Sequence, residues 1–237
     1  MAYDVRTMTN HSGFTALLGL AAAAISCAAL GQDAAPLYVV TYFEARPPAR
    51  AEAAAALKAQ RDAARRDEGN LRSEVVQHAS RPGQFVMLSA WKDAKAFEAQ
   101  RDNLRTREFL DRVHALRVSP ADNRLHGALS VGALDAGRAA AGAVWVVTHV
   151  DVIPPRKDDA VVLLKELGEA SRKDDGNLRY EIVQQTNRPN HFTVIEVWKS
   201  RQAFEAHGIS GHVREFRDKL APMSGALYDE RLYEVLN

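Results

Sequence analysis

The sequence repeats itself once, and this duplication limits the folds open to the chain more than any other feature. Motifs of the first half recur 107 residues later, in a register without gaps over about ninety residues. The clearest pairs are Pro47-Pro48 with Pro154-Pro155, Gly69-Asn70-Leu71-Arg72 with Gly176-Asn177-Leu178-Arg179, Trp91-Lys92 with Trp198-Lys199, and Ala96-Phe97-Glu98-Ala99 with Ala203-Phe204-Glu205-Ala206. We therefore expect two copies of one small fold.

The two copies are separated by a segment rich in glycine and alanine. We predict repeat 1 over 37–130, a flexible linker over 131–143 and repeat 2 over 144–237. The names repeat 1 and repeat 2 are used below for these two parts of the chain.

Within repeat 2 the hydrophobic period changes in the order strand, helix, strand, strand, helix, strand. The predicted strands cover 144–152, 178–185, 191–198 and 228–235, and the predicted helices cover 156–173 and 203–220. We expect the first helix to end at Gly176-Asn177, and the second to be interrupted near Gly208 and Gly211. This βαββαβ order predicts an α+β fold of the ferredoxin-like type, with both helices on one face of a four-stranded antiparallel sheet.

The strand over 191–198 is apolar on both sides, and so is the strand over 85–91. Both faces of each sheet therefore need to be buried. We predict that the two ferredoxin-like repeats pack sheet to sheet within the chain as an intramolecular dimeric α+β barrel. A single chain would then replace a homodimer, so we expect a monomer that is itself a pseudo-dimer, with further association left open.

Residues 1–31 have the features of a signal peptide. Arg6 precedes an apolar run over 14–24, which is too short to span a bilayer, and Ala29-Leu30-Gly31 offers small side chains to a signal peptidase. We expect cleavage after Gly31, no stable membrane insertion afterwards, and a periplasmic or secreted protein. Two alternatives stay open: a lipoprotein signal ending at Cys27, and a buried alanine-rich helix.

Charge and cysteine content exclude several classes of protein. Lys and Arg number 31 and Asp and Glu 30, so the net charge is +1, which argues against a nucleic-acid or anionic-membrane partner. Cys27 is the single cysteine, which excludes an intrachain disulfide, a cysteine-based zinc site and an iron–sulfur cluster. The Gly-Asn-Leu-Arg motif is no phosphate loop, so no nucleotide cofactor is expected.

Several motifs of repeat 2 resemble the antibiotic biosynthesis monooxygenase (ABM) domain family, whose members are dimeric α+β barrels of ferredoxin-like units. The matching segments are 175–181, 192–200 and 203–207, followed by His212. The resemblance covers 38–129 and 145–236. It implies the dimeric α+β barrel fold. For activity it implies one of the alternatives found in the family, which are cofactor-independent oxygenation of quinols or polyketide phenols, haem degradation, or no established reaction.

Repeat 1 departs from the family pattern at three polar positions. It has Ser89, Gln100 and Arg105 where repeat 2 has Glu196, His207 and His212. We therefore expect repeat 2 to retain a pocket and repeat 1 to be degenerate.

Oxygenation without a metal or flavin needs a substrate that supplies its own electrons, and a protein that helps to deprotonate it in a dry pocket. His207 suits the base, because an imidazole titrates near neutral pH. Period-two alternation places Phe192, Glu196 and Trp198 on one face of a strand, so we expect Glu196 to orient His207 and Trp198 to form a wall for a planar ligand. The other expected substrate-binding residues are Phe192, His149, Asn177, Tyr180 and His212.

Purely structural roles remain open for the same residues. These are Glu196 paired with Arg179, Trp198 in the core, His207 capping a broken helix, His212 exposed to solvent and His149 buried in the core. We expect no bound metal, because His149, His207 and His212 lack a further carboxylate at a recognisable spacing. Haem held by His207 is the one cofactor alternative.

The sequence thus predicts an extracytoplasmic, cofactor-independent monooxygenase or quinol oxidase that acts on a small aromatic phenol or quinol. One rival is a non-catalytic protein that binds a small aromatic molecule in the same fold. The other is a barrel that serves only assembly.

Overall fold

The computed structural model describes residues 35–134 and 142–236, which belong to one compact unit. The predicted signal peptide and the middle of the predicted linker lie outside the described residues. Repeat 1 consists of β1 (Leu37–Glu44), α1 (Arg50–Ala64), β2 (Asn70–His78), β3 (Gln84–Trp91), α2 (Ala94–Asp102), α3 (Leu104–His114) and β4 (Asp122–Ser130). Repeat 2 consists of β5 (Val144–Asp151), α4 (Lys157–Ser171), β6 (Asn177–Gln185), β7 (His191–Trp198), α5 (Arg201–Gly208), α6 (Gly211–Leu220) and β8 (Asp229–Val235).

Both repeats follow the predicted βαββαβ order, with the second helix divided in two. In repeat 2 the division falls between Gly208 and Gly211, as predicted. The expectation for Gly176 was wrong, because α4 ends earlier, at Ser171. Gly176 lies in the turn that follows, with φ of 81°, and a Cβ there would come within 2.7 Å of the Cβ of Ala203. Left-handed backbone and the close approach of α5 both require glycine at this position.

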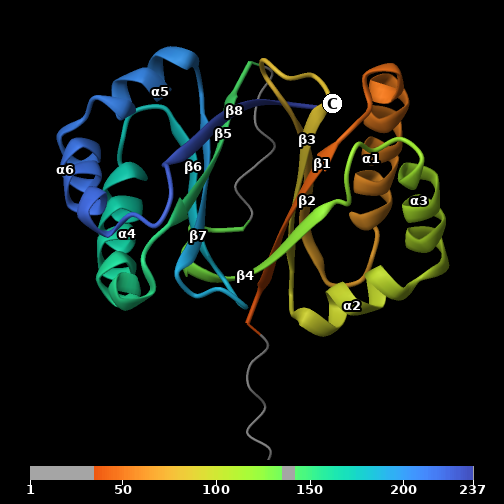
Figure 1. Ribbon diagram of the computed structural model, residues 1–237, viewed down its shortest axis with the longest axis horizontal. Coiled ribbons are helices and arrows are strands. Elements are labelled where there is room, and N and C mark those ends of the chain that lie inside the picture. Colours follow the sequence, from red (N-terminus) through yellow and green to blue (C-terminus); the bar gives the residue numbers. More distant parts are fainter. Residues whose placement is uncertain (1–34, 135–141, 237) are drawn as a thin grey trace, which may run out of the picture. The chain divides into compact units, whose positions relative to one another are not determined.

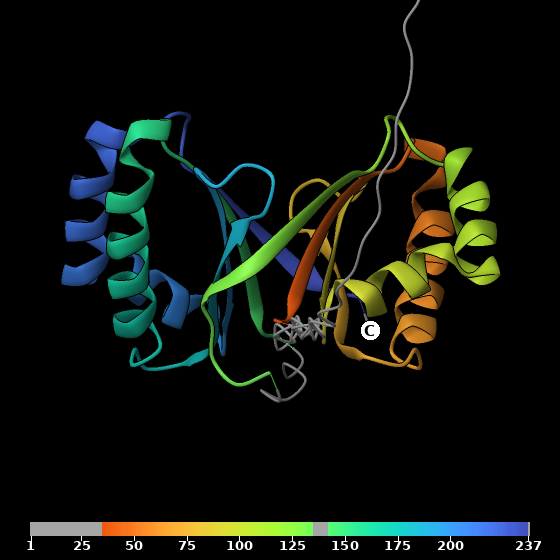
Figure 2. The same ribbon diagram turned by 90° about the horizontal axis from the view of Figure 1, so that it is seen from below.

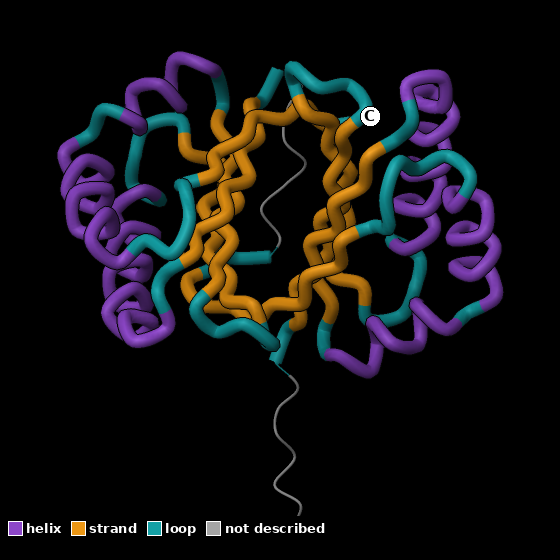
Figure 3. Tube along the Cα trace, viewed as in Figure 1, coloured by secondary structure: helices purple, strands orange, loops and turns teal. Residues whose placement is uncertain are grey.

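The eight strands form one closed barrel in the order β1-β3-β2-β8-β5-β7-β6-β4 (Figures 1 and 3). Each repeat contributes a four-stranded antiparallel sheet, and the sheets join along two seams, β2 with β8 and β4 with β6. Both seams pair a strand of repeat 1 with a strand of repeat 2, so neither sheet keeps an open edge. The predicted intramolecular α+β barrel is confirmed.

The helices of the two repeats cover opposite outer sides of the barrel (Figure 2). Each sheet therefore has one face toward its own helices and one toward the barrel interior, which explains the strands that are apolar on both sides. The interior is filled by a cluster that includes Val40, Val86, Trp145, Ile195 and Tyr233. No helix in the described part of the chain combines the length and apolar character needed to cross a membrane.

Two buried ion pairs cross the barrel interior between the repeats. The Arg179 guanidinium donates to both carboxylate oxygens of Glu74, at 2.8 and 2.7 Å. The Arg72 guanidinium donates to Glu181 at 2.5 Å. Arg72 and Glu74 occupy the positions in repeat 1 that Arg179 and Glu181 occupy in repeat 2, so the two pairs are related by the pseudo-twofold symmetry of the duplication.

His126 on β4 gives the barrel a predictable sensitivity to acid. Its side chain is fully buried, with Nε2 3.0 Å from Thr193 Oγ1 on β7, and burial lowers its pKa to about 4. Below its ordinary pKa of about 6.5, His126 gains a proton in the unfolded chain but not in the folded one, so stability is lost as the pH falls from 6.5 toward 4. Between pH 6.5 and pH 4 the wild type should lose about 3 kcal/mol of unfolding free energy through His126. The variant His126→Gln lacks this group and should not show that part of the loss.

Urea unfolding of both proteins at pH 6.5, 5 and 4 measures this difference. His149, whose pKa burial also lowers to about 4, is present in both proteins and serves as a constant background. Parallel losses of stability in the two proteins would contradict the prediction.

Candidate functional site

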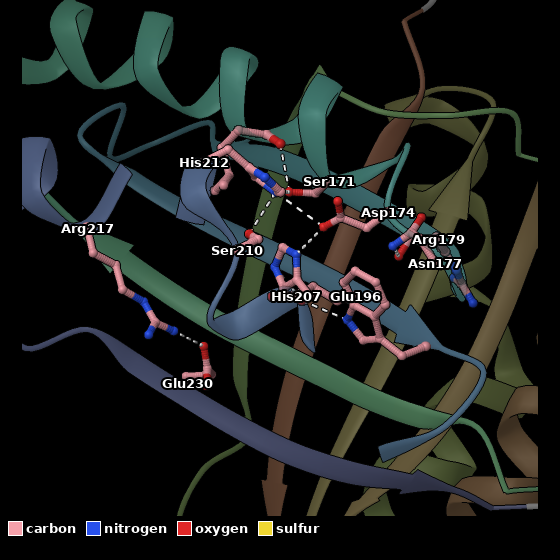
Figure 4. A network of polar contacts seen from close by, with 12 residues as sticks. Ser171, Asp174, Asn177, Arg179, Glu196, His207, Ser210, His212, Arg217 and Glu230 are labelled. Atoms are coloured by element: carbon pink, nitrogen blue, oxygen red, sulfur yellow. Dashed lines mark hydrogen bonds and ion pairs between the residues drawn. The ribbon is translucent and has the colours of Figure 1, made fainter. Parts of the chain in front are cut away.

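Three side chains of repeat 2 meet where its helices approach one end of the sheet (Figure 4). Asp174 lies in the turn after α4, His207 in the last turn of α5, and His212 in the first turn of α6. Asp174 Oδ2 is 2.7 Å from His207 Nδ1 and 3.2 Å from His212 Nε2. Since a carboxylate only accepts hydrogen bonds, His207 Nδ1 donates to Asp174. His212 Nε2 is within ion-pair distance of Asp174, and its hydrogen-bond partners are Ser171 Oγ at 3.5 Å and Ser210 Oγ at 3.4 Å.

Glu196 on β7 lies on the buried side of this group. Its Oε2 accepts a hydrogen bond of 2.9 Å from Trp198 Nε1 and lies 3.7 Å from His207 Nε2. Burial raises the pKa of Glu196 to about 8, which favours the protonated carboxyl group. Burial also lowers the pKa of His207, against the opposing effect of Asp174, and so favours the neutral imidazole.

The space on the sheet side of His207 is filled by aromatic side chains. The His207 ring lies against Trp198, with ring centroids 4.5 Å apart, and Tyr180 contacts both rings. Trp198, Tyr180 and Phe216 belong to one buried cluster, against which Tyr228 packs. A polar hollow of about 340 Å³ adjoins Asp174, His207 and Ser210 on the outer side and is open to solvent.

The other predicted residues do not join this group. His149 Nε2 is 3.1 Å from His191 Nδ1, and His149 lines a separate hollow with Tyr42 and Arg124. Phe192 is buried at the opposite end of β7. Asn177 donates to the carbonyl of Arg179 at 3.3 Å, and Arg179 pairs with Glu74 rather than with Glu196. His212 is half-buried and bonded, not free in solvent.

The surroundings of His207 do not fit a haem. An axial ligand has to direct a ring nitrogen at the iron, with room for the macrocycle beside it. In His207, Nδ1 is held by Asp174, Nε2 faces Glu196, and the ring face lies against Trp198.

A second cavity, of similar size, lies in repeat 1, between its sheet and its helices. This cavity has a volume of about 350 Å³, within the range of pockets that hold small organic ligands. Its apolar walls include Phe43, Leu57, Met87, Trp91, Phe97 and Phe109. The cavity exists because three large side chains of repeat 2 are small in repeat 1. These exchanges are Ser73 for Tyr180, Ser89 for Glu196, and Ala121 for Tyr228.

The polar part of the cavity lining includes the charged side chains of Arg101 and Arg117 and the hydroxyl groups of Ser73, Ser89 and Thr106. Ser89 Oγ accepts from Trp91 Nε1 at 3.0 Å, and Ser73 Oγ accepts from Asn70 Nδ2 at 2.9 Å. Thr106 Oγ1 accepts two amide hydrogen bonds, from Gln60 at 3.2 Å and from Gln100 at 3.0 Å. Each oxygen is occupied as an acceptor, so each hydroxyl keeps its own hydrogen for donation to a ligand oxygen.

The sequence prediction missed Asp174 and the repeat 1 cavity. Asp174 has a counterpart, Asp67, in repeat 1, so a comparison of the two copies does not single it out. The signal for the cavity was available, because Ser73 and Ala121 stand opposite two tyrosines in the alignment of the repeats. The prediction considered only the polar residues that repeat 2 keeps. It did not consider that smaller side chains in repeat 1 leave space for a cavity.

Comparison with known proteins agrees with the duplicated barrel. Residues 36–112 and 143–219 each match the sequence profile described as "Antibiotic biosynthesis monooxygenase". A crystal structure of a "putative monooxygenase" from Fusobacterium nucleatum superimposes with a TM-score of 0.75 and 15% identity, over 86% of this chain and 94% of that one. At this identity the similarity shows the fold alone.

Two curated relatives match single parts of the chain. The "uncharacterized protein sll1783" of Synechocystis is 24% identical over 92 residues, which are 39% of this chain and 63% of that protein. The "Putative monooxygenase YcnE" of Bacillus subtilis is 25% identical over 68 residues, which are 29% of this chain and 72% of that protein. The first of these matches spans less than two thirds of the relative.

Proposed function

Because the chain belongs to the antibiotic biosynthesis monooxygenase family, we propose that it is a cofactor-independent monooxygenase or quinol oxidase acting on a small aromatic phenol or quinol. We further propose that the substrate binds in the cavity of repeat 1. The signal-peptide features of residues 1–31 support a site of action outside the cytoplasm.

The single observation that carries this proposal is the combination of apolar walls and free hydroxyl groups in the repeat 1 cavity. An engineered cavity of about 150 Å³ lined by apolar side chains binds benzene, so a space of about 350 Å³ accommodates a substituted aromatic ring. Trp91 and Phe97 offer aromatic faces to such a ring. Ser73, Ser89 and Thr106 offer hydrogen-bond donors to its oxygens.

These donors favour the anionic form of a phenol or quinol. A phenolate oxygen accepts stronger hydrogen bonds than a neutral phenol, so O–H groups held in place around it lower the pKa of the bound ligand. The quinolate then gives two electrons and its remaining hydroxyl proton to O2, and a proton from water completes hydrogen peroxide. Quinol and O2 are thereby converted to quinone and hydrogen peroxide. In this reaction the protein contributes binding and stabilisation of the anion.

One feature of the cavity favours a second function, the binding of a small aromatic molecule without turnover. Among the described residues that line it, none is Asp, Glu or His, so the lining offers no general base. An oxidase built on this cavity has to bind a quinol that loses its proton to water.

Two measurements on the same ligand separate these functions. Anaerobic calorimetry with methylhydroquinone should show one binding site per chain, and an oxygen electrode should then show uptake that saturates over the same concentration range. Binding without oxygen uptake above the rate of autoxidation identifies the non-catalytic binder. Absence of binding across substituted hydroquinones and phenols contradicts both.

A further inference from the structure

We propose that Asp174, His207 and His212 form a binding site for a divalent first-row transition-metal ion, with Zn²⁺ as the representative ion. This inference does not depend on the proposed function, because the site lies in repeat 2 and the cavity lies in repeat 1. Each residue offers one ligand atom, and these atoms all lie within 4.8 Å of one another.

The donor set is that of known metal sites. Two imidazole nitrogens and one carboxylate oxygen hold zinc in hydrolases and ferrous iron in oxygenases. A tetrahedral ion about 2.1 Å from each donor places the donors about 3.4 Å apart, so a pair at the 4.8 Å limit has to close by ~1.4 Å. Asp174 Oδ2 is already 3.2 Å from His212 Nε2 and 2.7 Å from His207 Nδ1. In the metal-bound form the ion replaces the proton that His207 Nδ1 shares with Asp174.

A second carboxyl group lies where metal sites usually have one. A histidine that binds a metal through one ring nitrogen commonly donates the other N–H to a carboxylate, which fixes the tautomer and the ring orientation. In His207 the nitrogen that faces away from Asp174 is 3.7 Å from Glu196 Oε2. Glu196 is 2% exposed and is itself held by Trp198 Nε1.

The duplication supplies an internal comparison. Asp67 of repeat 1 corresponds to Asp174, and it pairs with the guanidinium of Arg105, whose Nη2 is 2.6 Å from Asp67 Oδ2. Arg105 occupies the position of His212, so repeat 1 places a fixed cation beside this carboxylate.

In repeat 2, Asp174 instead contacts two imidazoles. The nearby ammonium of Lys199 is bonded to both oxygens of Asp175, at 2.9 Å each. Repeat 1 thus has the guanidinium of Arg105 beside the carboxylate, whereas repeat 2 has two imidazoles there. These imidazoles are possible ligands for a metal ion.

The site is open on one side. The hollow of about 340 Å³ that adjoins Asp174 and His207 reaches solvent, and Ser210 lines it as well. Three protein ligands with a solvent-facing side leave coordination positions for water or for a small ligand, as in catalytic rather than structural zinc sites.

The test uses the untagged chain, stripped of metal with a chelator. Calorimetry with Zn²⁺ should show one ion per chain, and addition of Co²⁺ should give visible absorption bands of a site with nitrogen and oxygen ligands. His212→Arg, which recreates the repeat 1 arrangement, should weaken Zn²⁺ binding by about 100-fold or more and remove the Co²⁺ bands.

His191→Gln is the matched control, because it removes one histidine of the separate His149–His191 pair and should leave Zn²⁺ affinity unchanged. Circular dichroism verifies that each variant is folded. If His212→Arg does not fold, His212→Gln takes its place. The His212 side chain is only half-buried, so a glutamine of similar size can replace it without disturbing the core. The proposal is overturned if Zn²⁺ does not bind, if the folded His212 variant binds it as the wild type does, or if the loss occurs in His191→Gln instead.

Discussion

Replacing Ser73 with phenylalanine is expected to abolish ligand binding and oxygen uptake while the barrel stays folded. Ser73 lines the repeat 1 cavity, and its counterpart Tyr180 shows that the equivalent strand position of repeat 2 holds an aromatic ring. The new ring occupies space that the substrate needs and removes one of the three free hydroxyl groups. We expect affinity for methylhydroquinone to fall by about 100-fold or more, which corresponds to roughly 2.7 kcal/mol.

A second filling variant and a control in repeat 2 define the result. Ala121→Phe should act in the same direction, because Ala121 stands opposite Tyr228. Tyr228→Phe changes one buried hydroxyl in repeat 2 and should leave turnover within about twofold of the wild type, since surface and distant sites act independently. Calorimetry and the oxygen electrode measure all three proteins. Wild-type turnover in Ser73→Phe would contradict the placement of the substrate.

Replacing Glu181 with alanine is expected to lower the free energy of unfolding by about 3–5 kcal/mol. Glu181 is fully buried and pairs with Arg72 of the other repeat. Its loss leaves the Arg72 guanidinium in the barrel interior with only the longer contact to Glu74, at 3.7 Å, which itself pairs with Arg179. Urea unfolding at pH 7 measures the effect. The size of this loss reports how strongly the two halves depend on contacts made inside the barrel.

The double variant Arg72→Met with Glu181→Met is the control for this prediction. Removing both charges also removes the cost of burying an unpaired one, and apolar replacements of buried ion pairs are often neutral or stabilising. We therefore expect the double variant to recover most of the stability that Glu181→Ala loses. A single variant that costs less than about 1 kcal/mol would indicate that water reaches Arg72 and that the interior is not closed.

Most of the fold could be predicted because local signals and the duplication agree. Pro154-Pro155 separates a strand from a helix, Gly208 and Gly211 divide the second helix, and the doubly apolar strand over 191–198 requires cover on both faces. Gly176 was misassigned because a positive φ serves a turn as well as a helix end. Glycine is required at this turn partly because Ala203 of α5 approaches it closely, and the sequence does not reveal such a tertiary contact.

The candidate site was less predictable, for two physical reasons. Asp174 reaches His207 from a turn 33 residues earlier in the chain, so its role depends on how α4 and α5 pack against the same sheet. The size of a cavity depends on the side chains at positions that are far apart in the sequence and face one another in the fold. Only the folded repeat shows that Ser73, Ser89 and Ala121 lie around one space. The expectation that repeat 2 holds the substrate pocket stays a prediction, now alongside the proposal for repeat 1.

Locating a bound aromatic ligand tests the central claim most directly. Crystals soaked with bromohydroquinone under anaerobic conditions should give an anomalous bromine peak inside repeat 1, between Trp91 and Phe109, with a ligand oxygen within hydrogen-bond distance of Thr106 Oγ1. A peak beside Trp198 in repeat 2, with the repeat 1 cavity empty, would contradict the account.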